Sequence, residues 1–466
     1  MSNEEELGTF RDRLGTIGEE GQRLWVYPKK PKGKLYNWRR ILAYVLTAIF
    51  FIGPFIKYKG DPILLLNIFE RKFVIMGVIF WPQDFYLLVM SMIALMIFVV
   101  LFTVIFGRLF CGWICPQTVF MEFLYRQVEY WIEGSHLQQR KLDDLKMNFR
   151  KFWKKTLKHL IFLIISFATI NAFLAYLIGI DNLMQFYRDG FGSHIGRTIG
   201  LFAFTFVHYI VFAKFREQVC IIVCPYGRLQ GVLLDKNSIS VAYDYKRGEP
   251  RKGSESDTTQ GDCIDCGNCE AVCPTGIDIR NGTQLECINC TACIDACDQV
   301  MVKVKKPKGL IRYASESTLA EGTTLKVNGR IIFYSVFLTL LLTLIGYLFS
   351  IRTDVETTIL RVQGTMFQEF DSAHYSNIYN CQVINKTRLE MPVELSIVGG
   401  KGEIKLLGNP LVVKKGEPGE VKFLVIMPKS ELNSSSNTIT FAISSNGKEI
   451  ERVESRFVAP NSLDNQ

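Results

Sequence analysis

The chain alternates between long apolar runs and polar, charged stretches, and five of the apolar runs suggest membrane helices. A helix needs about 20 apolar residues to cross about 30 Å of hydrocarbon. The five candidate spans are Ile41–Ile56, Phe85–Phe106, Leu160–Ile180, Gly196–Ala213 and Ile331–Ser350. The stretch Ile63–Trp81 is also apolar, but Glu70, Arg71 and Lys72 interrupt it. It is therefore predicted to be an interfacial helix or a re-entrant piece, not a span.

Lysine and arginine residues gather on one side of these spans. They are dense in Lys29–Arg40, in the connection 107–159 and after the fourth span, whereas the turn Asp181–Ile195 carries only Arg188. Because cytoplasmic loops of membrane proteins carry the excess of Lys and Arg, we expect the N-terminus inside and the C-terminus outside. The first 21 residues are polar and contain no apolar signal region, so no cleavable secretory signal is expected.

Beyond the fifth span the pattern changes to short alternating segments separated by Gly, Pro, Asn and Ser. These segments are 393–398, 403–407, 411–415, 420–426 and 438–444. Short strands at this spacing predict a β-sandwich of about 100 residues, immunoglobulin-like in size. The region contains one cysteine, Cys381, so an inter-sheet disulfide is excluded and a buried structural thiol is expected.

Twelve of the 13 cysteines fall in tight groups, which favours metal ligation over a disulfide framework. From Cys263 the chain reads CIDCGNCEAVCP, and from Cys287 it reads CINCTACIDACD. Each is C-x2-C-x2-C-x3-C, the spacing with which bacterial ferredoxins hold two [4Fe–4S] clusters. In that arrangement each fourth cysteine ligates the other cluster. The expected ligands are Cys263, Cys266, Cys269 and Cys297 for the first cluster, and Cys287, Cys290, Cys293 and Cys273 for the second.

A pair of zinc sites is the alternative for these eight cysteines, since C-x2-C pairs also bind zinc. It is less favoured because the duplicated spacing is particular to iron–sulfur ligation. The second group ends in Asp298 where the first has Pro274, a departure that removes no ligand.

Two further cysteine pairs occur at the ends of predicted spans. Cys111 and Cys115 lie in FCGWICPQ after the second span, and Cys220 and Cys224 lie in VCIIVCPYG after the fourth. If these stretches are helical, the i, i+4 spacing puts both thiols of a pair on one face. Two such helix ends could then present four sulfurs to one metal, and thiolates favour Cu(I), Zn or an iron–sulfur centre. The alternative is that they are buried core cysteines.

Residues beside these pairs carry two further expectations. Pro116 and Pro225 are predicted to end each helix just after its pair. Trp113 and Tyr226 are expected to lie at the membrane interface, as aromatic residues often do. His208, inside the fourth span, could be a ligand, or it could hydrogen-bond to a neighbouring helix.

These patterns together predict a multi-domain membrane protein. The expected division is a cytoplasmic N-terminal segment 1–38, a four-helix membrane region 39–215 with the C-x3-C-P motifs, a cytoplasmic two-cluster ferredoxin-like domain 216–330, the fifth span 331–351 and an external immunoglobulin-like sandwich 352–466. The net charge is +9, but the basic residues lie beside apolar runs and form no continuous polar face. Membrane lipid is therefore expected as a partner, and nucleic acid is not.

The segments GRLFCGWICPQTVFME, VCPYGRLQGVLLD, CPTGIDIRNGTQLECINC and SNIYNCQVINKT together resemble the CcoG family, also called FixG or RdxA. The resemblance extends over nearly the whole chain. It implies a multi-pass protein of the bacterial inner membrane with a periplasmic C-terminal domain. It also implies reduction of Cu(II) to Cu(I) during assembly of a cbb-type cytochrome oxidase.

In that picture the partners are the oxidase or its copper-delivery proteins, and the electron donor is unidentified. Copper would be bound or reduced by Cys111, Cys115, Cys220 and Cys224. Two other functions are compatible with the same residues. One is a quinol-linked electron-transfer subunit without copper chemistry, although the sequence has no recognisable quinone motif. The other is an oxidase assembly scaffold whose clusters are structural or sensory.

Overall fold

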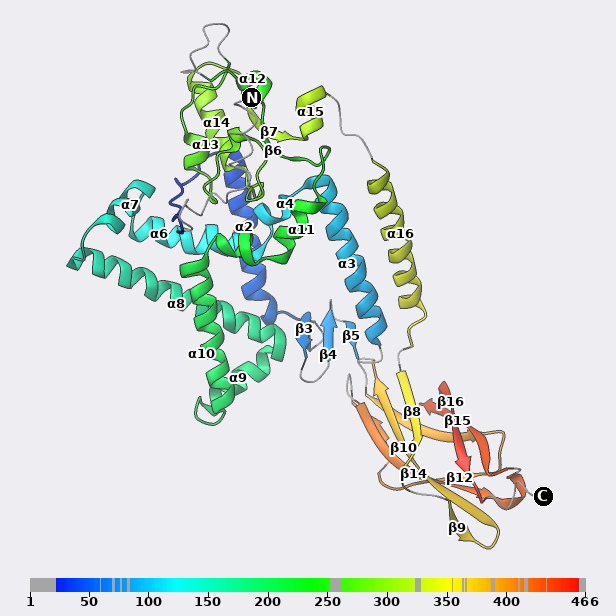
Figure 1. Cartoon of the computed structure of the whole chain (residues 1–466). Helices are drawn as coiled ribbons and strands as arrows, with labels where there is room; N and C mark the ends of the chain where they lie inside the picture. Colours follow the sequence, from blue (N-terminus) through cyan, green and yellow to red (C-terminus); the bar gives the residue numbers. More distant parts are fainter. Residues whose placement is uncertain are drawn as a thin grey trace. The chain divides into compact units, whose positions relative to one another are not determined.

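The computed structural model describes most of the chain (Figure 1). The described residues are 22–460 apart from 59, 69–71, 76–77, 82–83, 252–260, 323–327, 354, 363, 365–366, 387–389, 410, 415–417 and 433. The polar N-terminal 21 residues and the charged residues Glu70 and Arg71 thus lie outside the described part. The chain divides into two compact units, Met1–Gly77 with Val89–Thr343, and Val78–Leu88 with Leu344–Gln466.

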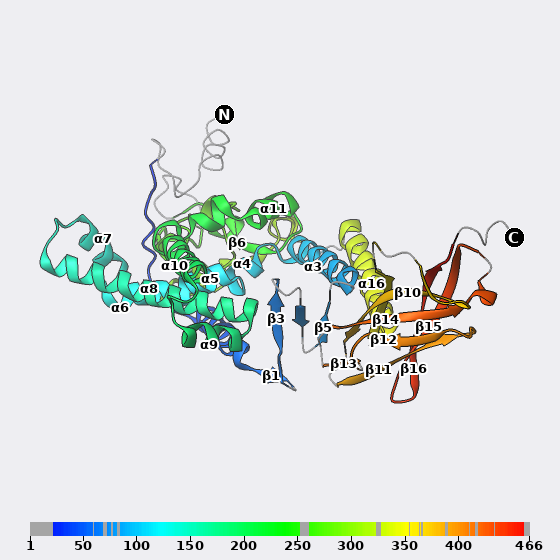
Figure 2. The same ribbon diagram turned by 90° about the horizontal axis from the view of Figure 1, so that it is seen from below.

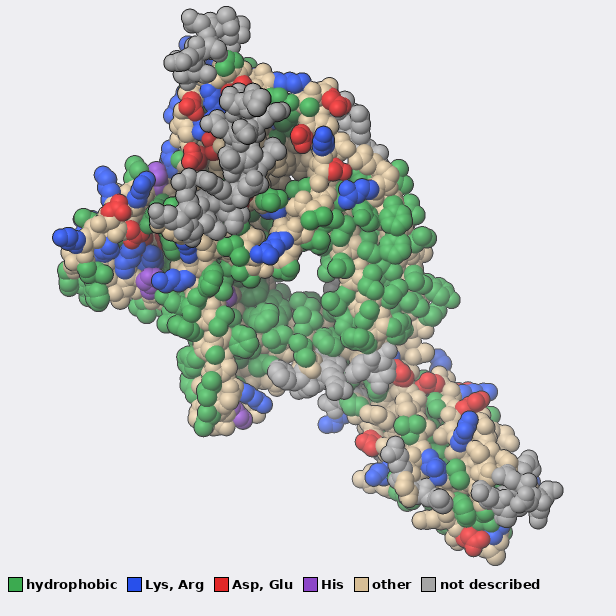
Figure 3. Space-filling model, in the orientation of Figure 1, with side chains coloured by type: hydrophobic (Ala, Val, Ile, Leu, Met, Phe, Trp, Pro, Cys, Tyr) green, Lys and Arg blue, Asp and Glu red, His purple; other side chains and the backbone are tan. Residues whose placement is uncertain are grey.

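Among the described residues, five helices are long and apolar enough to cross a membrane, as the hydrophobic pattern predicts. They are α2 (Lys34–Ile52, continued by η1, Gly53–Phe55), α3 (Phe85–Phe106), α8 (Phe149–Ile178), α10 (Ile195–Ile210, continued by η4, Val211–Phe215) and α16 (Gly329–Ser350). Helices α8 and α10 lie side by side (Figures 1 and 2). Hydrophobic side chains cover the visible face of α16 (Figure 3), as expected for a helix that faces lipid.

Helix α8 begins eleven residues before the predicted span, at Phe149 instead of Leu160. The preceding residue, Asn148, caps the helix, because its side-chain oxygen accepts a hydrogen bond of 2.9 Å from the Lys151 N–H. The added turns contain basic and aromatic residues, so hydropathy alone did not identify them.

The interfacial helix predicted for Ile63–Trp81 is wrong, whereas the prediction that this stretch is not a span agrees with the candidate spans found among the described residues. The chain there forms short strands, β3 (Leu64–Asn67), β4 (Lys72–Ile75) and β5 (Val78–Phe80), preceded by β1 (Lys57–Tyr58) and β2 (Asp61–Pro62). Strands β3 and β4 pair as an antiparallel hairpin with Leu65 opposite Val74, and both of these side chains are buried. Two apolar runs of about four residues, separated in the sequence by charged residues, suit paired strands better than a helix, which needs a longer uninterrupted pattern.

Short elements fill the rest of the first unit. After α3 come α4 (Leu109–Trp113), α5 (Pro116–Phe120), η3 (Met121–Tyr125), α6 (Arg126–Ile132) and α7 (His136–Asp144), and α9 (Ile180–Asp189) follows α8. After α10 come η5 (Val219–Val223), α11 (Pro225–Leu233), β6 (Ser240–Tyr243), α12 (Tyr245–Gly248), α13 (Asn268–Ala271), η6 (Ile279–Asn281), α14 (Ala292–Lys303), β7 (Ile311–Ala314) and α15 (Glu316–Glu321). Antiparallel pairing of β6 with β7 brings together the two ends of the cysteine-rich segment.

The second unit contains the predicted sandwich of two antiparallel sheets. One sheet has the order β12 (Glu403–Leu406), β14 (Pro418–Pro428), β10 (His374–Asn385) and β8 (Val355–Arg361), with β9 (Gln368–Asp371) also paired to β10. The other has the order β13 (Leu411–Val413), β11 (Met391–Val398), β15 (Ser436–Ser445) and β16 (Lys448–Val458). Tyr379, Phe423 and Phe441 meet between the sheets, with ring centroids 5.6 Å apart.

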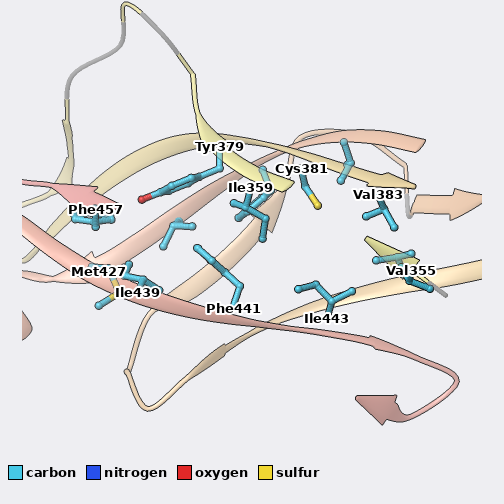
Figure 4. Packing of buried hydrophobic residues seen from close by; sticks show 14 of the residues in the cluster. Val355, Ile359, Tyr379, Cys381, Val383, Met427, Ile439, Phe441, Ile443 and Phe457 are labelled. Carbon is cyan, nitrogen blue, oxygen red and sulfur yellow. The ribbon is translucent and has the colours of Figure 1, made fainter. Parts of the chain in front are cut away.

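Cys381 is fully buried in this core, on β10 (Figure 4), which confirms the expected buried thiol. We expect Cys381→Ser to lower the free energy of unfolding of the second unit by about 1–3 kcal/mol, because a hydroxyl is placed among apolar side chains. Thermal unfolding of the purified protein measures this. Cys381→Ala is the control for lost packing without the hydroxyl. Unchanged stability of the serine variant would contradict the assignment of Cys381 to a sealed apolar core.

Candidate metal centres

The two cysteine groups fold with the same local backbone. Asp265 and Asn289 precede the second cysteine of their groups and have φ of 55° and 52°. Gly267 and Thr291 follow that cysteine and have φ of 63° and 64°. A β-branched residue rarely adopts positive φ, and the buried Thr291 is partly supported because its hydroxyl donates a 2.6 Å hydrogen bond to the Cys290 carbonyl. The repeat in sequence is therefore also a repeat of one turn in structure.

The eight cysteines line two cavities of similar size. One, with about 360 Å³ of atom-free space, is bordered by all four cysteines expected for the first cluster, Cys263, Cys266, Cys269 and Cys297. The other, with about 340 Å³, is bordered by the four expected for the second, Cys273, Cys287, Cys290 and Cys293, and also by Cys269. Each cavity thus draws thiols from both groups, as cross-ligation requires. Four thiols around a mostly apolar cavity are the donor set of a cubane cluster, so the residues fit two [4Fe–4S] clusters.

Burial controls the ionisation of these thiols. It raises the pKa of Cys269 and Cys290 to about 11, and that of Cys287 and Cys297 to about 12. Such thiols are protonated at neutral pH until a metal displaces the proton. All thirteen cysteines are in the described part of the chain, and Cys266 is the exposed one among them. The first cavity therefore has an exposed thiol at its rim, whereas the four expected ligands of the second cavity are buried or half-buried.

The C-x3-C-P motifs are not continuous helices, so the expected i, i+4 arrangement is wrong. Cys111 lies in the short helix α4, whereas Cys115 has an extended backbone (φ −54°, ψ 125°) and is the N-cap of α5. Cys220 and Cys224 repeat this pattern, because Cys220 lies in η5 and Cys224 caps α11. The proline after each pair begins a helix instead of ending one. Proline has no N–H to donate, and the first helical position needs none.

The four C-x3-C-P thiols are nevertheless neighbours. Burial, and secondarily the charge of Cys115, raises the pKa of Cys111 to about 11. Burial, and secondarily the charges of the other three thiols, raises the pKa of Cys220 to about 12. Cys111 also donates a 3.4 Å hydrogen bond to the fully buried Gln230. Among the described residues, no three Cys, His, Asp or Glu side chains lie close enough together to hold one metal ion.

The first C-x3-C-P motif lies directly against the second cysteine set. A Cβ on Gly112, between Cys111 and Cys115, would collide with the Ile288 carbonyl, so only glycine permits this approach. Cys111 packs against the buried cluster that contains Ile288 and Cys290. The loop between Cys287 and Cys290 is thereby held beside the membrane-edge thiols.

Buried arginines join the C-x3-C-P motifs to the ferredoxin loops, and no local sequence pattern indicates that they are buried. Arg39 of α2 donates to the Gly112 carbonyl (2.6 Å) and to the Cys290 carbonyl (3.5 Å). Arg108 donates to the Gly227 carbonyl (2.5 Å) in the second motif's helix and to the Leu285 carbonyl. One arginine side chain can donate hydrogen bonds to several carbonyls. Arg39 and Arg108 therefore each connect a C-x3-C-P motif to the ferredoxin loops.

A third arginine, Arg126, is fully buried and ion-paired with Glu122 and Glu217. It also donates to the carbonyl of Pro274, the proline that follows the first cysteine group (2.9 Å). Trp113 donates to the Tyr313 hydroxyl of β7 at 3.2 Å, and its position at the lipid interface stays a prediction.

The two other side chains singled out from the sequence make local contacts. Tyr226 shares a 2.8 Å hydrogen bond with the Thr103 hydroxyl of α3. His208 lies 3.4 Å (Nδ1) from the Tyr125 hydroxyl, which supports the cross-helix reading of this histidine. A ligand role for His208 stays a prediction.

Comparisons with known proteins agree with this architecture. Residues 215–316 match a family model described as a 4Fe–4S dicluster domain, and residues 88–138 match a 4Fe–4S binding domain. Residues 345–460 match the Ig-like fold at the C-terminus of FixG.

Three curated relatives show the extent of the likeness. Protein RdxA of Cereibacter sphaeroides is 33% identical over 81% of this chain and 83% of its own length. Protein RdxB of the same organism is 31% identical over 83% of this chain and 85% of its own. Nitrogen fixation protein FixG of Rhizobium meliloti is 36% identical over 65% of this chain, and that match spans 60% of FixG.

Five membrane-type helices, a duplicated ferredoxin turn and two thiol-lined cavities define a membrane-associated iron–sulfur protein of the electron-transfer class. The chain belongs to the FixG/RdxA family.

Proposed function

We propose that the protein is a cupric reductase that converts Cu(II) to Cu(I) for the assembly of a cbb-type cytochrome oxidase. The observation that carries this proposal is the approach of the first C-x3-C-P motif to the second cysteine set at Gly112. It brings soft sulfur donors next to a site suited to one-electron chemistry. Thiolates stabilise Cu(I) over Cu(II), so copper bound at such sulfurs is easier to reduce.

The residues divide into two roles in this proposal. The crossed sets of four, Cys263, Cys266, Cys269 and Cys297, and Cys287, Cys290, Cys293 and Cys273, each hold one [4Fe–4S] cluster. When bound, two such clusters supply one electron each, enough to reduce two Cu(II) ions to two Cu(I) ions. Copper is the substrate, and the neighbouring thiols of Cys111, Cys115, Cys220 and Cys224 bind it while it is reduced. The exposed Cys266 is where an external electron donor, still unidentified, can approach.

We also propose that the ferredoxin-like domain 216–330 is cytoplasmic and the sandwich 352–466 is periplasmic in a bacterial inner membrane. The Lys/Arg bias supports this orientation. The oxidase, or a protein that delivers copper to it, is then the expected partner. The domain limits at 38, 215, 330 and 351 belong to the same proposal.

The test is a titration of anaerobically reduced, full-length protein with Cu(II) in the presence of a Cu(I)-specific chelator. About two Cu(I) per chain are expected as the visible absorbance of the clusters returns to the oxidised form. Replacing all four of Cys111, Cys115, Cys220 and Cys224 with serine should abolish this copper reduction while iron content is retained. Cys381→Ser is the matched control, because this cysteine is buried in the other unit.

Two outcomes would contradict the proposal. Reduced protein that ignores Cu(II) would favour electron transfer to another partner, or a scaffold. Full copper reduction by the four-serine variant would remove the C-x3-C-P thiols from the mechanism.

A second candidate for the four thiols is an additional iron–sulfur centre. The matched 4Fe–4S binding segment 88–138 favours it, because Cys111 and Cys115 are the cysteines in that segment. Iron analysis separates the two, since two clusters contain about eight iron atoms and three contain about twelve.

A further inference from the structure

Arg39 is a charged side chain of the first membrane helix, and it is buried between the first C-x3-C-P motif and the second cysteine set. It is 1% exposed, and its hydrogen bonds go to the backbone carbonyls of Gly112 and Cys290. Its guanidinium carbon lies 5.1 Å from the centre of the Phe123 ring. The cation therefore sits inside the protein, at the junction of the first C-x3-C-P motif and the second cysteine set.

The charge of Arg39 has no carboxylate partner in the part of the chain that the structure describes. Its Nη2 atom is buried and makes no hydrogen bond there. A buried cation is costly unless negative charge lies nearby. The second cysteine set can carry such charge and lies beside the guanidinium, because Arg39 donates to the carbonyl of Cys290 at 3.5 Å. A cluster held by four thiolates would supply the missing negative charge.

The first cysteine set has an arginine too, but its charge is offset. Arg280 pairs with Asp278 at 2.7 Å, with Asp265, and with Glu270 at 4.0 Å. The two sets thus differ in local charge, although their loops repeat the same turn. Around Arg280 carboxylates outnumber the cation, whereas Arg39 makes no ion pair among the described residues.

We propose that Arg39 is a positioning residue that holds the second cysteine set against the first C-x3-C-P motif and raises the reduction potential of the cluster bound there. The inference rests on the proposed assignment of Cys273, Cys287, Cys290 and Cys293 as ligands. The reduced form of a cluster carries one more negative charge than the oxidised form. An uncompensated cation beside it stabilises that form, and it acts strongly because the surroundings are buried. An electron is thereby favoured at the set that lies next to the C-x3-C-P thiols.

The experiment is a potentiometric titration of the purified full-length protein, followed by electron paramagnetic resonance of the reduced clusters. Arg39→Met should lower one of the two midpoint potentials, so that the ratio of reduced to oxidised cluster at a fixed potential falls about tenfold, or about 59 mV for one electron. Arg39→Lys keeps the charge and should lower this potential much less. Arg40→Met is the matched control, because Arg40 is the next residue of the same helix and is exposed. It should change neither potential.

A further variant identifies which cluster has moved. Arg280→Met should lower the other midpoint potential, because Arg280 borders the first cavity. If Arg39→Met fails to retain iron, Arg39→Gln is measured instead, since its amide can still donate to the Gly112 carbonyl without a charge.

Unchanged potentials in an uncharged Arg39 variant with full iron content would overturn the inference. An equal fall in Arg39→Lys would also overturn it, because packing and not charge would then be the cause. Neither result affects the proposed function, which fails instead if the reduced, unaltered protein ignores Cu(II).

Discussion

Replacing Cys293 with alanine is expected to remove about half of the iron and acid-labile sulfide from the protein. Cys293 is half-buried and lines the second cavity, and burial raises its pKa well above the ordinary range. Alanine fills the same apolar position but supplies no thiolate, so the second set keeps three donors. Because the two sets would hold clusters of equal composition, loss of one leaves about half the metal. Chemical iron and sulfide analysis of anaerobically purified protein measures this.

The matched control for Cys293→Ala is Cys381→Ala, which also deletes a buried thiol but lies in the sandwich core. Its iron content should equal that of the unaltered protein. Full iron in Cys293→Ala would exclude this residue as a ligand. Loss of all iron would show instead that one cluster cannot be retained without the other.

Replacing Asp84 with alanine is expected to destabilise the second unit by about 3–5 kcal/mol, the cost of breaking a buried ion pair. Asp84 is 2% exposed, and its two oxygens accept 2.8 Å hydrogen bonds from Arg352 and Lys386. Lys386 also pairs with Glu356 at 2.9 Å. Removal of Asp84 leaves two largely buried cations. Lys386 keeps the partially exposed carboxylate of Glu356, and Arg352 keeps no ion pair among the described residues. Thermal unfolding of the full-length protein, with the sandwich transition resolved, measures the loss.

The same ion pairs predict a pH dependence. Burial raises the pKa of Asp84, but the hydrogen bonds from Arg352 and Lys386 outweigh burial and hold the pKa below its usual value. The stabilisation is therefore complete above the ordinary carboxyl pKa, and it is lost as the pH falls through the lowered one. Asp371→Ala is the control, because that carboxylate is exposed and pairs only locally with His374. Equal stability of Asp84→Ala and Asp371→Ala would contradict the prediction.

The sequence predicts those features of the fold that depend on local pattern. The five spans follow from hydropathy, and the sandwich strands follow from alternation. The crossed cysteine sets also follow, because ligand spacing is a property of the chain alone. Where local pattern was ambiguous, the prediction was wrong. Ile63–Trp81 is as apolar as an interfacial helix but forms strands, and the prolines after the C-x3-C-P pairs begin helices.

The contact between the first C-x3-C-P motif and the second cysteine set could not be predicted from the sequence, because it joins segments that are distant along the chain. Arg39 resembles any basic residue at the start of a membrane helix, and nothing in its neighbours indicates that it is buried against Cys290. Gly112 likewise has no local reason to be glycine, since its φ is not positive. Glycine is required at this position because a Cβ would collide with the backbone of Ile288, which lies more than 170 residues later in the chain.

The crossing of the two cysteine groups also governs when the protein can be loaded during its synthesis. Each expected ligand set takes three thiols from one group and a fourth from the other, so Cys297 completes the first set, and Cys287, Cys290 and Cys293 complete the second. A nascent chain that has emerged only as far as Cys273 has closed neither. Metal insertion therefore waits until the ribosome has passed the entire ferredoxin segment, by which stage four of the five membrane helices have already been made.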